Sequence, residues 1–364
     1  MLDGIRVVEI EGLGPAPFAA MLLADLGAEV TVIHRPGGGP AISGGRNLLD
    51  RGKRSIELDL KSAADLAVAR ALLGRADALI EGFRPGVMEK LGLGPEEMQR
   101  ANPKLVYGRM TGWGQDGPRA RTAGHDLNYL ATSGALWYAG LPGEAPVPPP
   151  TLLGDVGGGA MYLVAGMLAG LLRAARTGEG TVVDAAIVDG SAHMMALLMS
   201  LQGSGNLEEA RGSSLLDAPP WGRVYACAAG WLSVQCLEPQ FYAIFLEGIG
   251  LTDDPLFAEQ MDRKAWPAQA ARLSEIFREK TAAAWAARFA GTDACVAEVL
   301  SPWGAAEDPH MAARGVWDRR EDMLQPAPAP RFDGVARIAG PIPKRGADSQ
   351  AIRAALRAEG LIPG

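Results

Sequence analysis

The segment GHDLNYLATSGAL, residues 124–136, places a histidine and an acid directly before an apolar run. His125 is one of only four histidines in the chain, and Asp126 follows it. Imidazole and carboxylate groups transfer protons near neutral pH, so the pair suits general acid–base chemistry. A structural role fits as well, because Asp126 can cap a helix whose buried face carries Leu127 and Leu130. Both interpretations stay open on this segment alone.

A second candidate acid is Asp155, in the segment GDVGGGAMYL at residues 154–163. Three consecutive glycines follow it, and an apolar helix is predicted to begin at about residue 160. Such glycines would let a ligand approach the backbone, and free amides at the helix start could hold an oxyanion. An Asp before Gly is also an ordinary helix cap, so this segment too has a catalytic and a structural interpretation.

The elements that must position these residues begin as alternating strands and helices. Apolar runs predict strands at 5–10, 29–34, 55–60, 77–83 and 105–110, with helices at 17–27 and 63–75 between them. A long helix at 157–178 is followed by a strand and a Met-rich helix over 181–201. This order predicts a Rossmann-like parallel sheet covered by helices.

The first strand and helix do not carry a dinucleotide-binding fingerprint. Gly12 and Gly14 match its first two glycines, but Pro17 replaces the third. The second strand ends in His34 and Arg35, where an acid would hold the ribose of NAD. We therefore expect no NAD in this protein.

Composition narrows the function classes further. The 364 residues carry a formal net charge of −7, which argues against general nucleic-acid binding. Basic clusters at 34–36, 51–55 and 83–86 could bind a small anion or simply be solvated surface charge. The three cysteines are widely spaced and without a CxxC pair, which predicts reduced thiols and no zinc site. The first residues lack a secretory pattern and apolar stretches such as ALLMSL are short, so we expect a cytoplasmic protein without a membrane span.

Three separated segments resemble the α-methylacyl-CoA racemases of the class III CoA-transferase superfamily: GHDLNY (124–129), GDVGGGAMYL (154–163) and EPQFY (238–242). Longer stretches are similar in the same order, among them LIEGFRPGVMEKLGLG, RMTGWGQDGP, GEGTVVDAAIVDGS and PAPRF. The resemblance runs from residue 2 to about residue 332.

The resemblance implies roles for three residues. His125 and Asp155 match the acid–base pair that flanks the α-carbon of a bound thioester. Glu238 matches an acid that hydrogen-bonds the catalytic histidine, reaching it from the other subunit. Such a bond would raise the basicity of the imidazole and orient its ring.

The resemblance also implies an architecture. Its members are interlocked homodimers with a large CoA-binding domain and a smaller α+β domain. We accordingly expect the N-terminal part of the large domain at 1–200, a linker at 201–222 and the small domain at 223–310. Residues 311–364 would return to the large domain.

Contacts to the CoA part of the substrate are implied residue by residue. They comprise Arg35, Asp59, Leu60, Lys61, Phe83, Arg84, Pro85 and Lys90. Arginine and lysine would pair with its phosphates. Backbone contacts to the pantetheine end would come from Gly124, Asp126, Asn128 and Tyr129. The resemblance would place an acid directly before Arg35, but this chain has His34 there. The mechanism that the resemblance implies needs no metal and no cofactor besides the CoA of the substrate.

Racemisation of a 2-methylacyl-CoA needs one proton-transferring group on each face of a planar enolate, and a His/carboxylate pair supplies both. One alternative is a CoA-transferase in which Asp155 is the nucleophile and forms an acyl-aspartyl anhydride. A transferase has no need of His125 with Glu238. A second alternative is a non-catalytic acyl-CoA-binding protein, which would have little reason to carry all three residues.

Methionines are the candidates for an acyl pocket, because flexible thioethers suit acyl chains of varied shape. Met195 and Met199 lie one helical turn apart beside Met194, and Met161 and Met167 lie on the preceding helix. A stripe of methionines at this spacing is equally typical of plain core.

Overall fold

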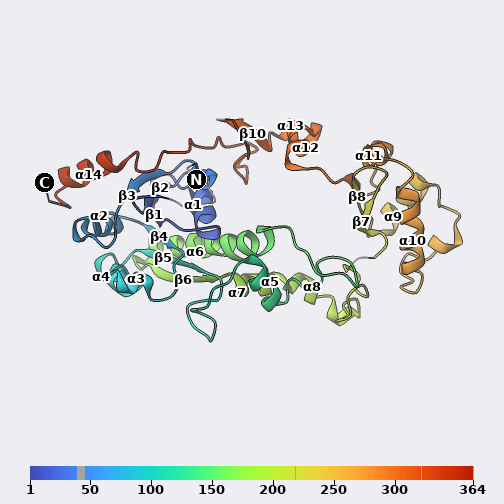
Figure 1. Cartoon of the computed structure of the whole chain (residues 1–364), viewed down its shortest axis with the longest axis horizontal. Helices are drawn as coiled ribbons and strands as arrows, with labels where there is room; N and C mark the ends of the chain where they lie inside the picture. Colours follow the sequence, from blue (N-terminus) through green and yellow to red (C-terminus); the bar gives the residue numbers. More distant parts are fainter. Residues whose placement is uncertain (39–45, 218, 321, 364) are drawn as a thin grey trace. The chain divides into compact units, whose positions relative to one another are not determined.

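The computed structural model describes residues 1–38, 46–217, 219–320 and 322–363. Within them the chain forms two compact units (Figure 1). The sheet unit comprises Met1–Leu136, Pro148–Met194 and Gly315–Gly364. The small unit comprises Trp137–Val147 and Met195–Arg314. The sheet unit is therefore assembled from both ends of the sequence.

The sheet unit is built on six parallel strands in the order β3-β2-β1-β4-β5-β6, which is the strand order of a Rossmann fold. The strands are β1 (Arg6–Ile10), β2 (Glu29–His34), β3 (Arg54–Glu57), β4 (Ala78–Glu81), β5 (Val106–Thr111) and β6 (Thr181–Ala186). This confirms the predicted fold class. Strands β3 and β4 end earlier than predicted, because the residues after them turn outward to line a cavity.

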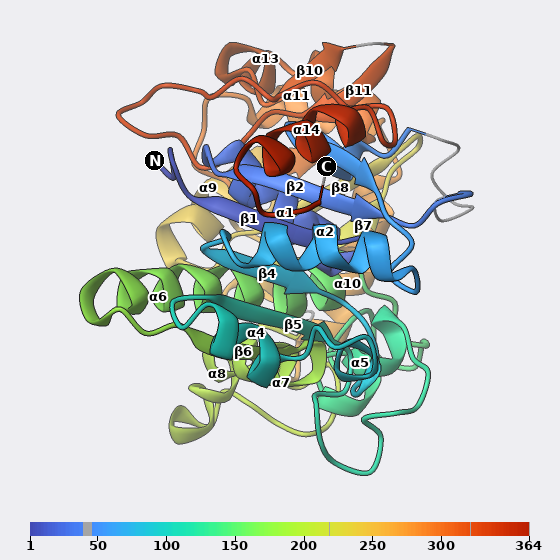
Figure 2. The same ribbon diagram turned by 90° about the vertical axis from the view of Figure 1, so that its left-hand side faces the viewer.

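Helices cover both faces of this sheet, as the alternation of side chains along a strand requires. Val7 of β1 and Ile80 of β4 pack in one apolar cluster with α1 (Pro15–Asp25) and α6 (Met161–Thr177). The neighbouring residue Val8 packs in the opposite cluster with α2 (Ala63–Leu73) and α14 (Ser349–Ala358). Figure 2 looks onto the face that α2 and α14 cover.

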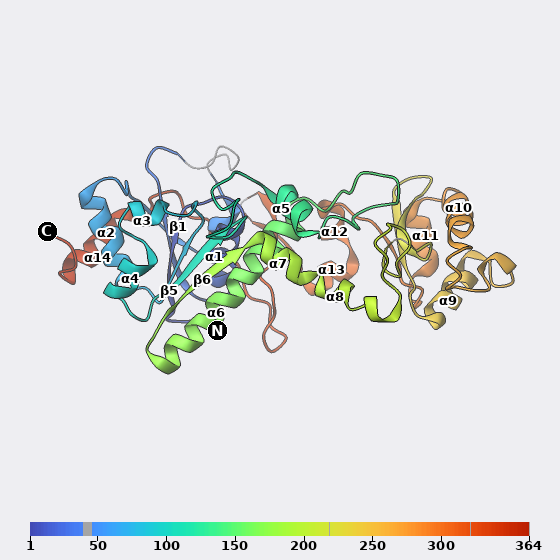
Figure 3. The same ribbon diagram turned by 90° about the horizontal axis from the view of Figure 1, so that it is seen from below.

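Helix α6 continues directly from a nine-residue π-helical segment, Leu152–Ala160, so the whole helix is longer than predicted. From Leu152 to Thr177 it is 26 residues long and apolar enough, by length and composition, to cross a bilayer. By length alone, the expectation that all apolar stretches are too short was therefore wrong, but the core helix of a soluble protein meets the same criterion, and the expected absence of a membrane span stays a prediction. Figure 3 shows α6 alongside β5 and β6. Met167 is fully buried in this packing, which makes it a core residue and not part of an acyl pocket.

The small unit combines an antiparallel sheet with helices around an aromatic core. Its strands, in the order β7-β8-β9, are β7 (Gly222–Ala226), β8 (Trp231–Gln235) and β9 (Val296–Glu298). The larger helices are α9 (Pro239–Ile249), α10 (Trp266–Phe277) and α11 (Ala282–Phe289). Phe245 and Phe277 lie at the centre of the aromatic cluster. This agrees with the predicted α+β class of the second domain.

The segment that follows residue 315 returns to the sheet unit and covers its open edge. It begins with the hairpin of β10 (Trp317–Arg320) and β11 (Met323–Pro326). Farther along, the Asp348 amide donates to the Ser55 carbonyl over 2.9 Å, and the Asp348 carboxylate accepts from the Ser55 amide over 2.8 Å. Because β3 is an edge strand, these bonds satisfy backbone groups that would otherwise be open to pairing with another chain.

Candidate active site

Two cavities lie where the parallel strands of the sheet unit end, the position at which open α/β sheets bind ligands. The larger cavity, of about 550 Å³, follows strands β1 to β4. It is lined by Ile10, Glu11, Gly12, Ile33, His34, Arg35, Gly38, Leu58, Asp59, Leu60, Lys61, Phe83, Val87 and Leu91. Its volume is typical of a pocket for a small-molecule ligand.

The smaller cavity, of about 180 Å³, is lined in part by His125. It is lined by Gly82, Phe83, Arg84, Pro85, Thr111, Gly112, Trp113, Ala120, Thr122, Ala123, Gly124, His125 and Tyr129. Phe83 lines both cavities, so the two cavities are neighbours at this residue.

Phe83 is positioned by a buried acid at the end of β4. The Glu81 carboxylate accepts the Phe83 amide over 2.7 Å and the Arg109 Nε over 3.2 Å. Burial raises the pKa of Glu81 to about 7, against the opposing effect of the Phe83 amide and Arg109. Glu81 thereby fixes the turn that separates the two cavities.

His125 is exposed at the start of α5 (Asp126–Ser133), where it is the N-cap residue with an extended backbone. Its amide donates to the Asn128 side chain over 3.0 Å. The expectation that Asp126 caps this helix was wrong, because Asp126 is the first helical residue. Its buried carboxylate instead accepts the amide of Asp155 over 2.8 Å. Asp126 therefore ties the His125 segment directly to the Asp155 segment.

Tyr129 holds the loop that carries His125. Its hydroxyl donates to the Gly124 carbonyl, and Trp113 packs edge-on against its ring at 4.8 Å between centroids. A β-carbon at Gly112 would overlap the Tyr129 ring, and one at Gly124 would lie 2.7 Å from it. Both glycines are therefore required by the packing of this tyrosine, a role that the sequence motif alone does not reveal.

The Asp155 carboxyl group is half-buried and electrostatically perturbed. Burial and, next, the charge of Asp126 raise its pKa to about 6, while His125 acts in the opposite direction. A β-carbon at Gly14, the N-cap of α1, would lie 3.5 Å from Asp155 Oδ2. The carboxyl thus lies between the start of α1 and the start of α5.

Two of the three glycines after Asp155, Gly158 and Gly159, serve helix packing, and the expectation that the run admits a ligand to the backbone stays a prediction. A β-carbon at Gly158 would lie 3.0 Å from the Ile187 carbonyl, and one at Gly159 2.9 Å from Ile187 Cγ1, both on α7 (Ile187–Met194). Asp155 is also not a residue before a helix, since it lies within the first turn of the π-helical segment. Its own amide is taken by Asp126, so it is not free to hold an oxyanion.

Glu238 belongs to the small unit, where it is exposed as the N-cap residue of α9. Its side chain makes no capping hydrogen bond. Its pairing with His125 stays a prediction.

The residues expected to contact CoA form three groups: those that line the larger cavity, those that line the smaller cavity and those that line neither. Arg35, Asp59, Leu60, Lys61 and Phe83 line the larger cavity. Arg84, Pro85, Gly124 and Tyr129 line the smaller one. The remaining three, Lys90, Asp126 and Asn128, line neither of these two cavities. Lys90 ends α3 (Val87–Lys90), between two residues whose side chains do line the larger cavity.

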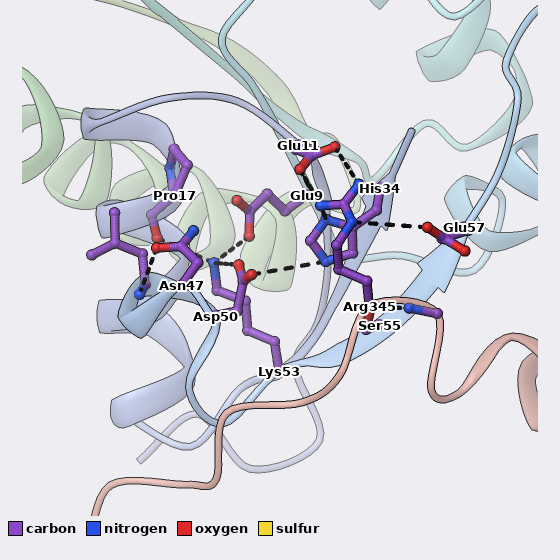
Figure 4. Close-up of polar contacts among 12 residues, drawn as sticks. Glu9, Glu11, Pro17, His34, Asn47, Asp50, Lys53, Ser55, Glu57 and Arg345 are labelled. Carbon is purple, nitrogen blue, oxygen red and sulfur yellow. Dashed lines mark hydrogen bonds and ion pairs between the residues drawn. The ribbon is translucent and has the colours of Figure 1, made fainter. Parts of the chain in front are cut away.

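A cluster of charged residues underlies the larger cavity, and the sequence analysis did not identify it (Figure 4). Buried Lys53 Nζ lies 2.5 Å from Glu9 Oε2 and 3.8 Å from Asp50 Oδ1. Nearer the cavity, Arg345 pairs with Glu11, and its Nη1 lies 2.8 Å from His34 Nδ1. No local signal could have revealed this group, because 334 residues separate Glu11 from Arg345.

Comparison with known proteins places this geometry in a family. The model of CoA-transferase family III matches residues 2–349. The chain is 44% identical over 333 residues to the alpha-methylacyl-CoA racemase of Mus musculus, covering 91% of this chain and 86% of that protein. The Homo sapiens protein of the same name is 44% identical over 332 residues, with 90% and 86% covered. A solved CAIB/BAIF family protein from Brucella suis superposes with a TM-score of 0.83 at 25% identity, covering 98% of this chain and 99% of that one.

Proposed function

This chain belongs to CoA-transferase family III, and on that premise we propose that it is an α-methylacyl-CoA racemase. It would interconvert the (2R) and (2S) forms of 2-methylacyl-CoA thioesters. The observation that carries the proposal is the hydrogen bond from the Asp155 amide to Asp126, which brings the His125 and Asp155 segments together. The 44% identity to two proteins named as racemases supports the same reaction.

The reaction requires removal of an α-proton that is far less acidic than any side chain in the site. In the proposed mechanism His125 and Asp155 face opposite sides of the α-carbon. One group takes the proton to leave a planar enolate, and the other returns a proton to the opposite face. A carboxyl group with a pKa of about 6 suits both removal and return of the α-proton, because its ionised and its protonated forms are both populated near neutral pH.

The two cavities suggest how the thioester is held. The larger cavity would take the nucleotide end of CoA, with Arg35 and Lys61 available to its phosphates. Pantetheine would pass Phe83 into the smaller cavity and bring the acyl carbon to His125. No cofactor besides the CoA of the substrate enters this scheme.

We further propose that Glu238 hydrogen-bonds His125 from the partner subunit of an interlocked homodimer. Its support is the motif match at 238–242 and the exposed carboxylate at the start of α9. A carboxylate in that place would stabilise the imidazolium formed during proton transfer.

The principal alternative is a CoA-transferase with Asp155 as nucleophile. It shares the CoA contacts, but it leaves His125 and Glu238 without a role. A non-catalytic acyl-CoA-binding protein has still less use for a half-buried carboxyl beside a histidine.

The deciding experiment follows a 2-methylacyl-CoA by proton NMR in deuterated water, with no second acid present. The proposal predicts loss of the α-proton signal together with epimerisation. CoA transfer that begins only when a free carboxylic acid is added would make the transferase alternative correct. Binding without exchange or transfer would support the non-catalytic alternative.

A further inference from the structure

We propose that Arg345 is a positioning residue for the nucleotide end of the ligand. It would hold in place the segment after β2, which includes Arg35, and it would neutralise acidic side chains beside the larger cavity. The inference rests on the proposed function only in taking the ligand to be a CoA thioester.

Arg345 bonds directly to the backbone of the cavity wall. Its Nη2 donates to the Arg35 carbonyl over 2.8 Å and to the Gly38 carbonyl over 3.2 Å. The same nitrogen donates to Glu11 Oε2 over 3.1 Å, and that oxygen accepts the Arg35 amide over 3.0 Å. The backbone of Arg35 is therefore held on both sides, which leaves its side chain to reach a phosphate.

Arg345 also lies beside acidic side chains at the larger cavity. Burial raises the pKa of Glu11, but hydrogen bonds to His34 and Arg345 outweigh it and lower the pKa to about 2. Glu11 is thus a fixed anion in the lining of a cavity proposed to receive phosphates. Glu57, at the end of β3, lies 3.8 Å from Arg345 Nε. Without the guanidinium, these carboxylates would repel the ligand.

The backbone of Arg345 is fixed independently of its side chain. The Gly346 amide donates to Ser55 Oγ over 2.8 Å (Figure 4). Two residues farther along, Asp348 is bonded to the backbone of Ser55. Removing the guanidinium therefore leaves the return segment attached to β3. The side chain is also partly exposed, unlike the buried Lys53–Glu9 pair beneath it.

The test compares two thioesters of one 2-methylacyl group, on CoA and on pantetheine, which lacks the nucleotide. For Arg345→Met we expect KM for the CoA thioester to rise about tenfold or more, with kcat within about twofold. Parameters for the pantetheine thioester should stay unchanged. Arg345→Lys keeps the charge but not the two-nitrogen geometry, so it should restore part of the loss.

Arg75→Met is the matched control. Arg75 also pairs with the return segment, through Glu359 at 2.6 Å, but it lines neither the larger nor the smaller cavity. It should leave both substrates unaffected. An equal loss on both thioesters in Arg345→Met, or an unchanged KM for the CoA thioester, would overturn the proposal.

A binding measurement separates this inference from the proposed function. Titration calorimetry with free CoA and with pantetheine needs no turnover. If the protein proves not to be a racemase but Arg345→Met weakens CoA binding alone, the inference stands and the function falls. If racemase activity is confirmed and CoA affinity is the same in Arg345→Met, the function stands and the inference falls.

Discussion

At the scale of single residues, Asp155 links catalysis to stability. Its pKa of about 6 in the folded protein exceeds the ordinary value of 3.8, so folding favours the protonated form. The ionised carboxylate therefore costs stability above pH 6, and the cost disappears as the pH falls below about 4. We expect Asp155→Asn to be inactive yet more stable than wild type at pH 7.5, by about 1 kcal/mol after allowance for solvent screening.

Urea unfolding at pH 4 and at pH 7.5 checks this expectation. The stabilisation by Asp155→Asn should be present at pH 7.5 and nearly absent at pH 4. Asp253→Asn, the same chemical change at an exposed position of the small unit, serves as the control. A destabilised Asp155→Asn at pH 7.5 would mean that the ionised carboxylate is favourably solvated in the fold.

The two proton-transferring residues should also differ in which epimer they serve. With each pure epimer in deuterated water, His125→Ala should lose exchange mainly on one and Asp155→Ala mainly on the other, because each group faces one side of the α-carbon. Loss on the same epimer in both variants would contradict the two-base mechanism.

Candidate catalytic residues could be identified from the sequence, but the contacts that they make could not. His125 and Asp155 stand out because each lies in a short motif with few alternatives. The role of Asp126 depends on an amide 29 residues away, and that of Arg345 on a strand end 311 residues away. Neither partner can be identified from local spacing, and helix-capping preference favours the wrong role for Asp126.

At the scale of elements, the π-helical segment 152–160 depends on a close approach to α7. A β-carbon at Gly158 would lie 2.8 Å from the Ser191 amide and 3.0 Å from the Ile187 carbonyl, and both are backbone atoms that cannot easily move. We predict that Gly158→Ala destabilises the protein by about 2 kcal/mol through this overpacking. Thermal unfolding followed by circular dichroism measures the effect.

Gly203 provides the control for that substitution. It lies in a short helical turn, Gln202–Ser204, with nothing within 4 Å of a β-carbon. Gly203→Ala should be neutral or slightly stabilising, since it only reduces the freedom of the unfolded chain. Equal destabilisation by both substitutions would show that backbone conformation, and not the contact with α7, is responsible.

Elements were predicted well wherever one face of a strand or helix is buried. The apolar runs that gave β1, β2 and β5 agree with the structure to within about two residues, because burial imposes the pattern. The start of the long helix was placed too late. Its glycine run is typical of a loop before a helix, whereas here the glycines make room for α7.

At the scale of the whole molecule, the proposed exchange of Glu238 between subunits can be tested by complementation. His125→Ala and Glu238→Gln should each catalyse almost no epimerisation when expressed alone, even where proton exchange on one epimer persists. Co-expressed, they would form mixed dimers in which one site combines an intact His125 with an intact Glu238 from the partner. We expect activity to recover to about a quarter of wild type, from random pairing of the chains in a two-fold dimer.

The control co-expresses His125→Ala with Asp155→Ala. Both residues lie in the sheet unit of one chain, so a mixed dimer would still have one defect in each site, and no recovery is expected. If His125→Ala with Glu238→Gln also fails to recover, Glu238 does not act across subunits.

The bonds between Ser55 and Asp348 have a consequence for synthesis of the protein on the ribosome. The two residues are 293 positions apart. At about 5–20 residues per second, β3 leaves the ribosome roughly 15–60 s before the segment that covers its edge. Throughout that interval the edge of β3 in the nascent chain lacks these partners, and an open strand edge is available for pairing with another chain. Until residue 345 has been synthesised, the growing chain also lacks the guanidinium that we propose to support CoA binding.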